Sequence, residues 1–144
     1  MDTIEGLGKV RLFEHLDRDE LARLASQMQS MSFANGPIIG ETNSSDGLYI
    51  ITSGMVRVTK RSDASQSEAV LAILRPGDTF GELGLIDGSP RSANVSAMGP
   101  LECYFLSRDA FQEALESHPE IALALLPALT SMVRSADPWL GGLI

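Results

Sequence analysis

The chain has 144 residues, of which 44% are apolar and 21% charged, and its formal net charge at pH 7 is −8. This length and composition are typical of one ordinary globular domain with a real core. The 11 basic residues are scattered along the sequence, which argues against a nucleic-acid surface. We therefore expect no nucleic-acid partner.

Cys103 is the single cysteine, which excludes an intrachain disulfide and any metal site made of several cysteines. His15 and His118 have no second metal ligand at a suitable spacing, so we expect neither a metal nor a cofactor. The N-terminus lacks the basic and then apolar build of a secretory signal, and no apolar run reaches membrane-spanning length. These features favour a cytoplasmic protein with no membrane partner.

The first part of the chain, residues 1–32, is predicted to be helical. Asp17 or Asp19 is placed to cap the helix that follows. The apolar residues that recur at helical spacing are Leu12, Phe13, Leu16, Leu21, Leu24, Ala25 and Met28.

Residues 33–107 consist of short apolar runs separated by turn signals such as Asn35-Gly36-Pro37. Several runs alternate between inward and outward residues, and Cys103 falls on an inward face, where we expect it to be part of the core. This pattern of short, alternating runs between turns predicts antiparallel strands in a sandwich or barrel. The strongest strand candidates are residues 48–52, 55–59, 70–74, 94–97 and 101–106.

Helical periodicity returns in residues 108–137, with one helix over 108–115 and another that begins at Pro119. Pro127 lies inside this last helix and Pro138 follows it, so we expect the last helix to be short or bent. Residues 138–144 form a tail. The predicted fold class is mainly β with flanking helices, in a single domain.

Residues 80–95 place Glu82 and Arg91 at opposite ends of one short loop punctuated by glycines. A guanidinium matches two phosphate oxygens at once, whereas a carboxylate can only accept and therefore suits a ribose hydroxyl. Gly81 and Gly84 let the backbone approach a ligand, and Leu83 to Ile86 can form one helical turn with free N–H groups. The loop predicts a site for a sugar phosphate; the alternative is an ordinary turn with a surface ion pair.

The segments Phe80-Gly81-Glu82-Leu83 and Ser89-Pro90-Arg91, with the return Ala93-Asn94-Val95, resemble the phosphate-binding cassette of cyclic-nucleotide-binding domains. That family includes the catabolite activator protein and the regulatory subunits of cAMP-dependent protein kinase. Further matching landmarks are Asp46 to Gly54 and Pro76-Gly77-Asp78, so the resemblance covers nearly the whole chain. It implies an antiparallel double-stranded β-helix, a jelly-roll-like β-roll with N-terminal and C-terminal helices.

The resemblance also implies residue roles, in which Glu82 takes the ribose 2′-hydroxyl and Arg91 takes the cyclic phosphate. Ser92 stands where cAMP sites have alanine or serine and cGMP sites often have threonine, so cAMP is favoured and cGMP is the alternative. The full set of expected ligand-binding residues is Phe80, Gly81, Glu82, Leu83, Gly84, Pro90, Arg91, Ser92 and Ala93.

In this family the base is covered by the C-terminal helix or by an aromatic side chain. Arg134, Ser135 and Trp139 are the candidates here, and an indole stacked on a purine contributes about 1–3 kcal/mol. The alternative is that Trp139 packs on the chain's own core or on a symmetry partner.

No catalytic triad or carboxylate dyad emerges, so we expect no enzyme. No output domain follows the last helix, which suggests a stand-alone sensor that signals to an unknown protein effector by movement of its C-terminal helix. The apolar residues of that helix are compatible with a homodimer. The alternatives are an interaction or dimerisation module with a degenerate pocket, and the severed sensor head of a DNA-binding regulator.

Overall fold

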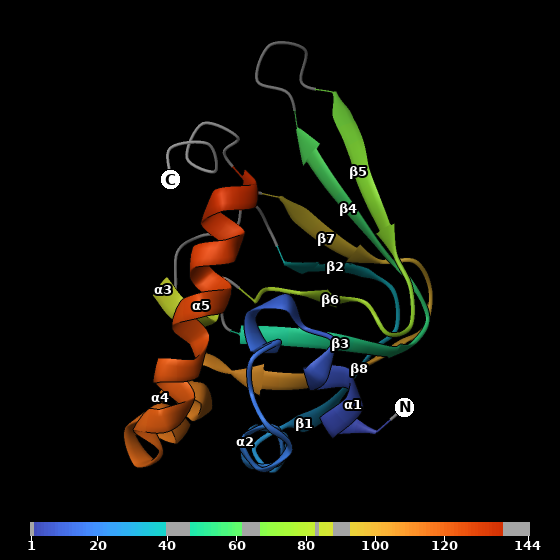
Figure 1. The fold of residues 1–144 in the computed structure, drawn as a ribbon. Coiled ribbons are helices and arrows are strands. Elements are labelled where there is room, and N and C mark those ends of the chain that lie inside the picture. The colour runs from blue at the N-terminus through green and yellow to red at the C-terminus, as the bar shows by residue number, and fades with distance from the viewer. Residues whose placement is uncertain (1, 40–46, 62–66, 83, 88–92, 137–144) are drawn as a thin grey trace.

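The computed structural model describes residues 2–39, 47–61, 67–82, 84–87 and 93–136. These residues form two four-stranded antiparallel sheets with helices gathered beside one of them (Figure 1). The first sheet has the order β1-β8-β3-β6, with β1 Gln29–Phe33, β3 Gly47–Ser53, β6 Thr79–Phe80 and β8 Leu101–Ser107. The second has the order β2-β7-β4-β5, with β2 Gly36–Ile39, β4 Val56–Arg61, β5 Glu68–Leu74 and β7 Asn94–Ala97. The predicted β-roll with flanking helices is confirmed.

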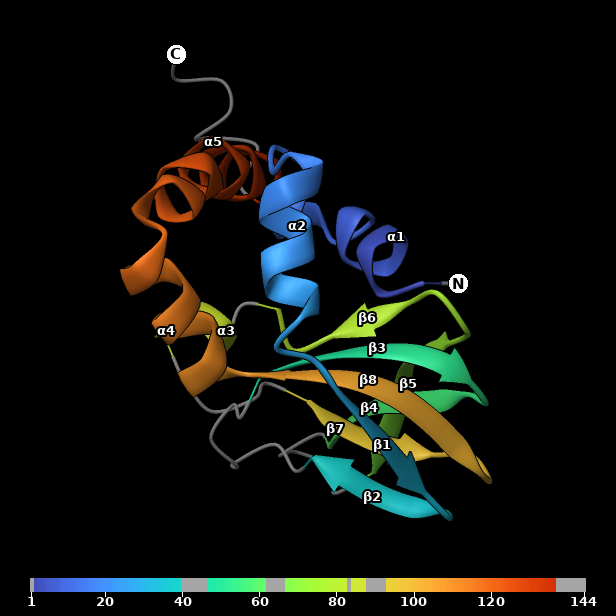
Figure 2. The same ribbon diagram turned by 90° about the horizontal axis from the view of Figure 1, so that it is seen from below.

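The helices cover the outer face of the first sheet (Figure 2). They come from both ends of the chain: α1 Thr3–Gly8, the 3-10 helix η1 Arg11–Phe13, α2 Arg18–Ala25, α4 Arg108–Ser117 and α5 Pro119–Ala136. No helix in the described part of the chain is both long enough and apolar enough to cross a bilayer.

Asp17 is the residue that caps α2. Its carboxylate accepts a hydrogen bond from the N–H of Glu20 at 2.8 Å, and the Glu20 carboxylate accepts one from the N–H of Asp17 at 2.9 Å. This reciprocal pair satisfies two backbone donors that the helix itself leaves free. The cap predicted at Asp17 or Asp19 is therefore Asp17.

Several elements begin or end one or two residues from their predicted limits, and two predictions, at β1 and at α5, are wrong. Residues 29–32 were predicted to be helical, but α2 ends at Ala25 and β1 begins at Gln29. The reason is that Met31 and Phe33 alternate with polar residues and pack against the core between the sheets, while β1 pairs with β8. The last helix is also not short, because α5 runs for 18 residues through Pro127. Burial of Ile121, Leu125 and Ala128 on both sides of the proline offsets its cost.

The core has two parts that share the first sheet. Leu48, Ile50 and Leu106 face the helices and form, with the apolar residues of those helices, the cluster we call the helical core. Tyr49, Ile51 and Cys103 face the other way and form, with Val56, Val95 and Ala97 of the second sheet, the cluster we call the inter-sheet core. Strand β3 is therefore buried on both faces.

Candidate functional site

The segment that leads into the candidate site is tied to the middle of β3. The N–H of Gly77 donates to the carbonyl of Ile51 at 2.8 Å, and the N–H of Ile51 donates to the carbonyl of Asp78 at 3.0 Å. The Asp78 carboxylate accepts from the N–H of Arg75 at 2.8 Å, which closes the turn, and Gly77 supplies a φ of 95°. These bonds fix where β6 begins.

Phe80 anchors the start of the site in the inter-sheet core. Its ring stacks on Tyr49 with centroids 4.7 Å apart and an interplanar angle of 10°, and Phe80 and Tyr49 are also backbone partners. Tyr49 contacts Phe105 in turn, again at 4.7 Å. The Phe80 side chain is thus a core residue whose packing positions the glycine and carboxylate that follow it.

Directly after Phe80 the chain turns at Gly81, whose φ of 93° favours glycine. Glu82 follows, and its carbonyl accepts a hydrogen bond from the N–H of Leu85 at 3.2 Å as the chain enters α3, Gly84–Asp87. The expected helical turn is present, one residue later than predicted. Leu85 is fully buried in the helical core, so the turn is packed onto the helices.

The Glu82 carboxyl is only partly accessible to solvent. Burial raises its pKa above the usual value of 4.5, and the positive charge of Arg11 opposes part of that rise. A carboxylate that has already lost much of its hydration can accept a hydrogen bond from a sugar hydroxyl with little further desolvation.

Arg11 connects this region to the last helix. Its guanidinium donates to the hydroxyl of Ser135 and, at 3.4 Å, to the carbonyl of Ser131, both in α5. The positive charge of Arg11 also lowers the pKa of Glu82, and η1 packs against α5, so Arg11 acts on both the candidate site and the last helix. Sequence analysis missed Arg11, because it belongs to no local motif and becomes relevant only through folding.

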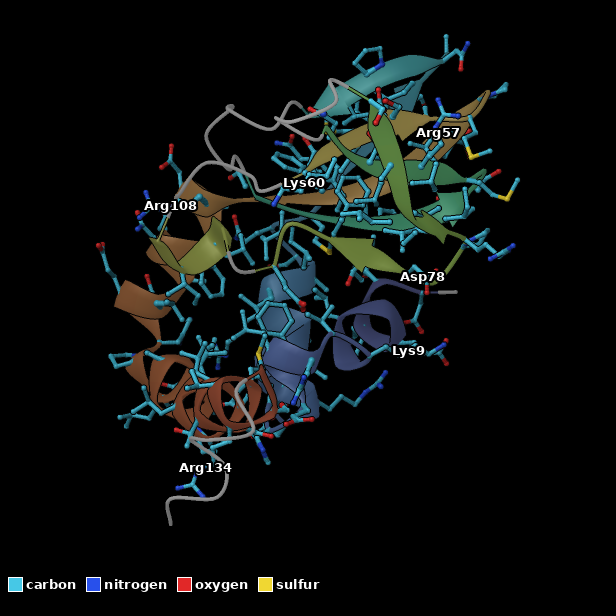
Figure 3. All side chains as sticks on the ribbon, turned by 90° about the horizontal axis from the view of Figure 1, so that it is seen from above. Lys9, Arg57, Lys60, Asp78, Arg108 and Arg134 are labelled. Carbon is cyan, nitrogen blue, oxygen red and sulfur yellow. The ribbon has the colours of Figure 1, made fainter. Side chains whose placement is uncertain are left out.

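Arg134 and Ser135, the expected base lid, lie near the end of α5. Ser135 is engaged by Arg11 and also donates to the carbonyl of Ser131 at 2.7 Å. Arg134 is exposed and points away from the sheets (Figure 3). In this arrangement Ser135 belongs to the contact between η1 and α5, and the role of Arg134 and Ser135 in covering a base stays a prediction.

On the opposite side of the expected loop, Ala93 is half-buried and leads into β7, where Asn94 pairs with Thr59 of β4. Thr59 is buried, and its hydroxyl has no hydrogen-bond partner among the residues the structure describes. Leu83, Pro90, Arg91, Ser92 and Trp139 lie outside the described residues, so their expected roles stay predictions.

Arg108 is a second positively charged residue that sequence analysis missed, and it lies near α3. Arg108 is the first residue of α4, which packs against α3 (Figure 3). Its Nε is buried and finds no hydrogen-bond partner within the described part of the chain. No motif singles it out, because its proximity to α3 depends on how α4 packs.

Cys103 is a core residue, as expected. It is buried in the inter-sheet core, and burial raises the pKa of its thiol to about 11. A thiol that stays protonated at neutral pH is a poor nucleophile.

The comparisons with known proteins agree with this geometry. Residues 32–118 match the family model described as the cyclic nucleotide-binding domain. The chain is 32% identical over its whole length to a protein of Mycobacterium tuberculosis named a CRP-like cAMP-activated global transcriptional regulator, and it spans 63% of that protein's length.

Two solved structures show the same fold. The N-terminal domain of a transcriptional regulator from Streptomyces coelicolor is 31% identical, with a TM-score of 0.82 over 92% of this chain and 95% of that one. The Thermus thermophilus catabolite activator protein is also 31% identical, with a TM-score of 0.71 over 91% of this chain and 62% of that one. These relatives bear the names of regulators, not of enzymes. The chain belongs to the cyclic nucleotide-binding domain family.

Proposed function

We propose that this chain is a regulatory module that binds a cyclic nucleotide, with cAMP as its ligand. The observation that carries the proposal is the partly buried Glu82 carboxylate at the junction of β6 and α3, inside the segment that matches the family model. The name of the M. tuberculosis relative, which is cAMP-activated, supports this choice of nucleotide.

In this proposal Glu82 accepts a hydrogen bond from the ribose 2′-hydroxyl, and Arg91 forms a bidentate pair with the cyclic phosphate. The carboxylate repels the phosphate, so the two charges orient the ligand as well as hold it. Ser92 can serve a phosphate oxygen or the 2-amino group of guanine, which keeps cGMP as the alternative ligand.

The test is calorimetric titration of the purified protein with cAMP and cGMP in parallel, after confirming that no nucleotide has co-purified. Arg91→Ala should weaken binding at least tenfold, since loss of the partner of a buried anion costs on the order of 2–5 kcal/mol. Arg75→Ala is the matched control, because it removes an exposed guanidinium from the turn before β6. Equal binding by wild type and Arg91→Ala would overturn the proposed site.

We further propose that binding is signalled through α3 to the C-terminal helix. Leu85 packs in the same helical core as Phe111 of α4 and Ile121 and Leu125 of α5, so a shift of α3 disturbs the packing of both helices. Hydrogen exchange of residues 119–136 should therefore change when nucleotide binds. Identical protection in the bound and free forms would contradict this mechanism.

A second candidate function is the sensor part of a transcriptional regulator. It is favoured by the names of the M. tuberculosis and S. coelicolor relatives and by the fact that this chain spans less than two thirds of the former. The expectation of no nucleic-acid partner therefore has no support from the comparisons. The test is cAMP-dependent DNA binding by the product of the complete reading frame.

The oligomeric state and the effector also belong to this proposal. Leu123, Leu126 and Val133 are exposed on the outer face of α5, where they could pair with the same helix of a second copy. Sedimentation analysis of wild type and Leu126→Glu distinguishes a dimer through this face from a monomer.

A further inference from the structure

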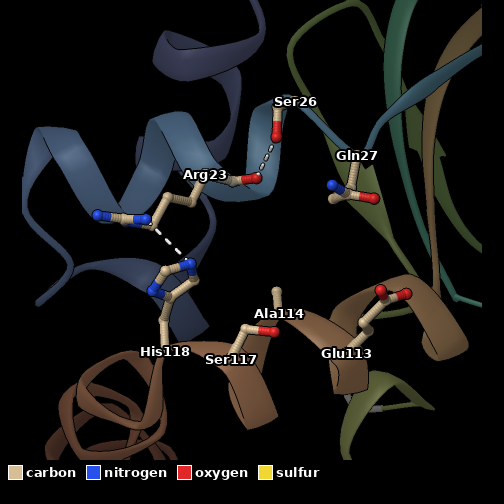
Figure 4. A pocket seen from close by; sticks show the side chains of 7 residues that line it. All are labelled: Arg23, Ser26, Gln27, Glu113, Ala114, Ser117 and His118. Carbon is tan, nitrogen blue, oxygen red and sulfur yellow. Dashed lines mark hydrogen bonds between the residues drawn. The ribbon is translucent and has the colours of Figure 1, made fainter.

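The joint between α4 and α5 touches the N-terminal helix α2 through one polar contact. His118 is the single residue between the two helices and has non-helical backbone angles, φ −136° and ψ 74°. Its N–H donates to the carbonyl of Ala114, and its own carbonyl accepts from the N–H of Ile121, both at 2.9 Å. The His118 side chain lines a hollow of about 220 Å³ between α2 and α4, opposite Arg23 (Figure 4).

The contact itself requires a neutral imidazole. Nη1 of Arg23 lies 2.9 Å from Nε2 of His118, and a guanidinium can only donate, so Nε2 must be the acceptor and carry no proton. The proton of the neutral ring is then on Nδ1, which lies 3.6 Å from Oε1 of Glu120 in α5. In this form the ring accepts from α2 and faces a carboxylate of α5.

Protonation would exchange these partners. A second ring proton, on Nε2, removes the acceptor for Arg23 and places two positive charges side by side. The carboxylate of Glu120 in α5, 3.6 Å from Nδ1, attracts the imidazolium, and Glu113 of α4 adds a second negative charge to the lining of the hollow. The charged ring therefore favours its own helix pair and is repelled from α2.

We propose that His118 makes the α4–α5 joint responsive to protons: the neutral side chain ties the joint to α2 through Arg23, and protonation releases α2. Histidine is the side chain that ordinarily changes charge between about pH 5 and 8. This inference goes beyond nucleotide binding, because a change of pH could then alter the packing of α2 against α4 and α5 without any ligand at the candidate site.

The chain offers a matched control, because it contains two histidines. His15 is exposed and lies 3.5 Å from the carboxylate of its sequence neighbour Glu14, and among the described residues no hydrogen bond or ion pair joins it to α4 or α5. His15→Gln therefore removes one titrating imidazole without touching the joint.

The experiment is hydrogen exchange of the nucleotide-free protein at about pH 5.5 and about pH 7.5, with protection corrected for intrinsic exchange rates. Wild type and His15→Gln should lose protection in α2 and around the joint at the lower pH, by about two- to tenfold, the effect of one lost hydrogen bond. His118→Gln keeps an acceptor that cannot gain a proton and should show no such loss. The same pH-dependent loss in His118→Gln would overturn the proposal.

A second readout covers the case in which His118→Gln does not fold. In wild type, the NMR signals of the Arg23 side chain should shift with the same midpoint as the ring signals of His118. Arg23→Gln should remove the pH-dependent change of protection, because no second positive charge then faces the ring. Independent midpoints for Arg23 and His118 would contradict a shared switch.

Discussion

Strands β3 and β5 have the same length, seven residues, and both are rich in apolar residues, yet their surroundings are opposite. β3 pairs on both edges, with β6 and β8, and both of its faces are covered. Within the described part of the chain β5 pairs only with β4, at the edge of its sheet, and Val70 and Leu71 are 56% and 57% exposed. The position of a strand among the layers, more than its hydrophobicity, decides how much of it is buried.

Because of this difference, the candidate site lies between a strand that is buried on both faces and a sheet whose edge strand is exposed. The anchors of the site, Phe80 and the turn before it, are bonded to the doubly covered β3. The return strand β7 belongs to the second sheet, whose edge strand is exposed. A rigid support on one side and an uncovered sheet on the other suit a site that must hold a ligand and still respond to it.

The largest expected effect on stability comes from truncating one apolar residue in each of the two strands. Ile50→Ala should lower the free energy of unfolding by about 2–5 kcal/mol, because it opens a cavity in the helical core. Leu71→Ala should change it by less than about 0.5 kcal/mol, since the side chain is already hydrated. Urea unfolding of both variants measures the difference; similar costs would mean that β5 is covered in solution.

The next test concerns the turn that ends β3. An added Cβ at Gly54, whose φ is 91°, would stand 2.4 Å from the carbonyl oxygen of Pro100, whereas at Gly99, with φ 107°, it would meet nothing within 4 Å. Gly99→Ala should cost about 1–2 kcal/mol from the backbone angle alone. Gly54→Ala should cost about 2–4 kcal/mol, because the steric clash adds to that strain. Equal costs in thermal unfolding would show that the close approach of β3 and β8 relaxes easily.

The smallest expected effect is at Glu82, in the candidate site itself. Its folded-state pKa is raised above 4.5, so the stability it contributes is present below that pH and is lost as the pH rises through the folded-state pKa. Glu82→Gln removes the cost of ionisation and should raise the melting temperature by about 1–4 °C near neutral pH, with little change near pH 4.5. The same substitution should weaken nucleotide binding.

Glu102→Gln, on an exposed position of β8, is the control for Glu82→Gln and should not alter the melting temperature at either pH. A lower melting temperature of Glu82→Gln at neutral pH would mean that the carboxylate is stabilised, not strained, in the free protein. The attraction of the Arg11 charge would then outweigh the effect of burial.

Much of the fold could be predicted from local patterns. The helical spacing of Leu21 and Leu24, the cap at Asp17 and the alternation along β8 were sufficient to place α2 and β8. The errors arose where a local signal was weak or was overruled. β1 is short and rich in serine, and Pro127 favours a break in the helix although burial on both sides carries α5 through it.

The residues of the candidate site also fall into those that the sequence could reveal and those that only the structure revealed. Gly81, Glu82 and Gly84 are neighbours along the chain, so their motif can be recognised from the order of residues alone. Arg11, Arg108 and the contact between Arg23 and His118 could not be found in this way, because each joins segments that are distant along the chain.

The sequence by itself was enough to predict most of the elements, the family and the motif of the candidate site, because periodicity, turns and short motifs depend on neighbouring residues. Only the tertiary structure decided that β3 is buried on both faces while β5 is not, that Phe80 belongs to the core, and that Arg11 of η1 bonds to α5. Burial, desolvation and contacts between distant segments arise when the layers pack together, and the local spacing of residues does not specify that packing.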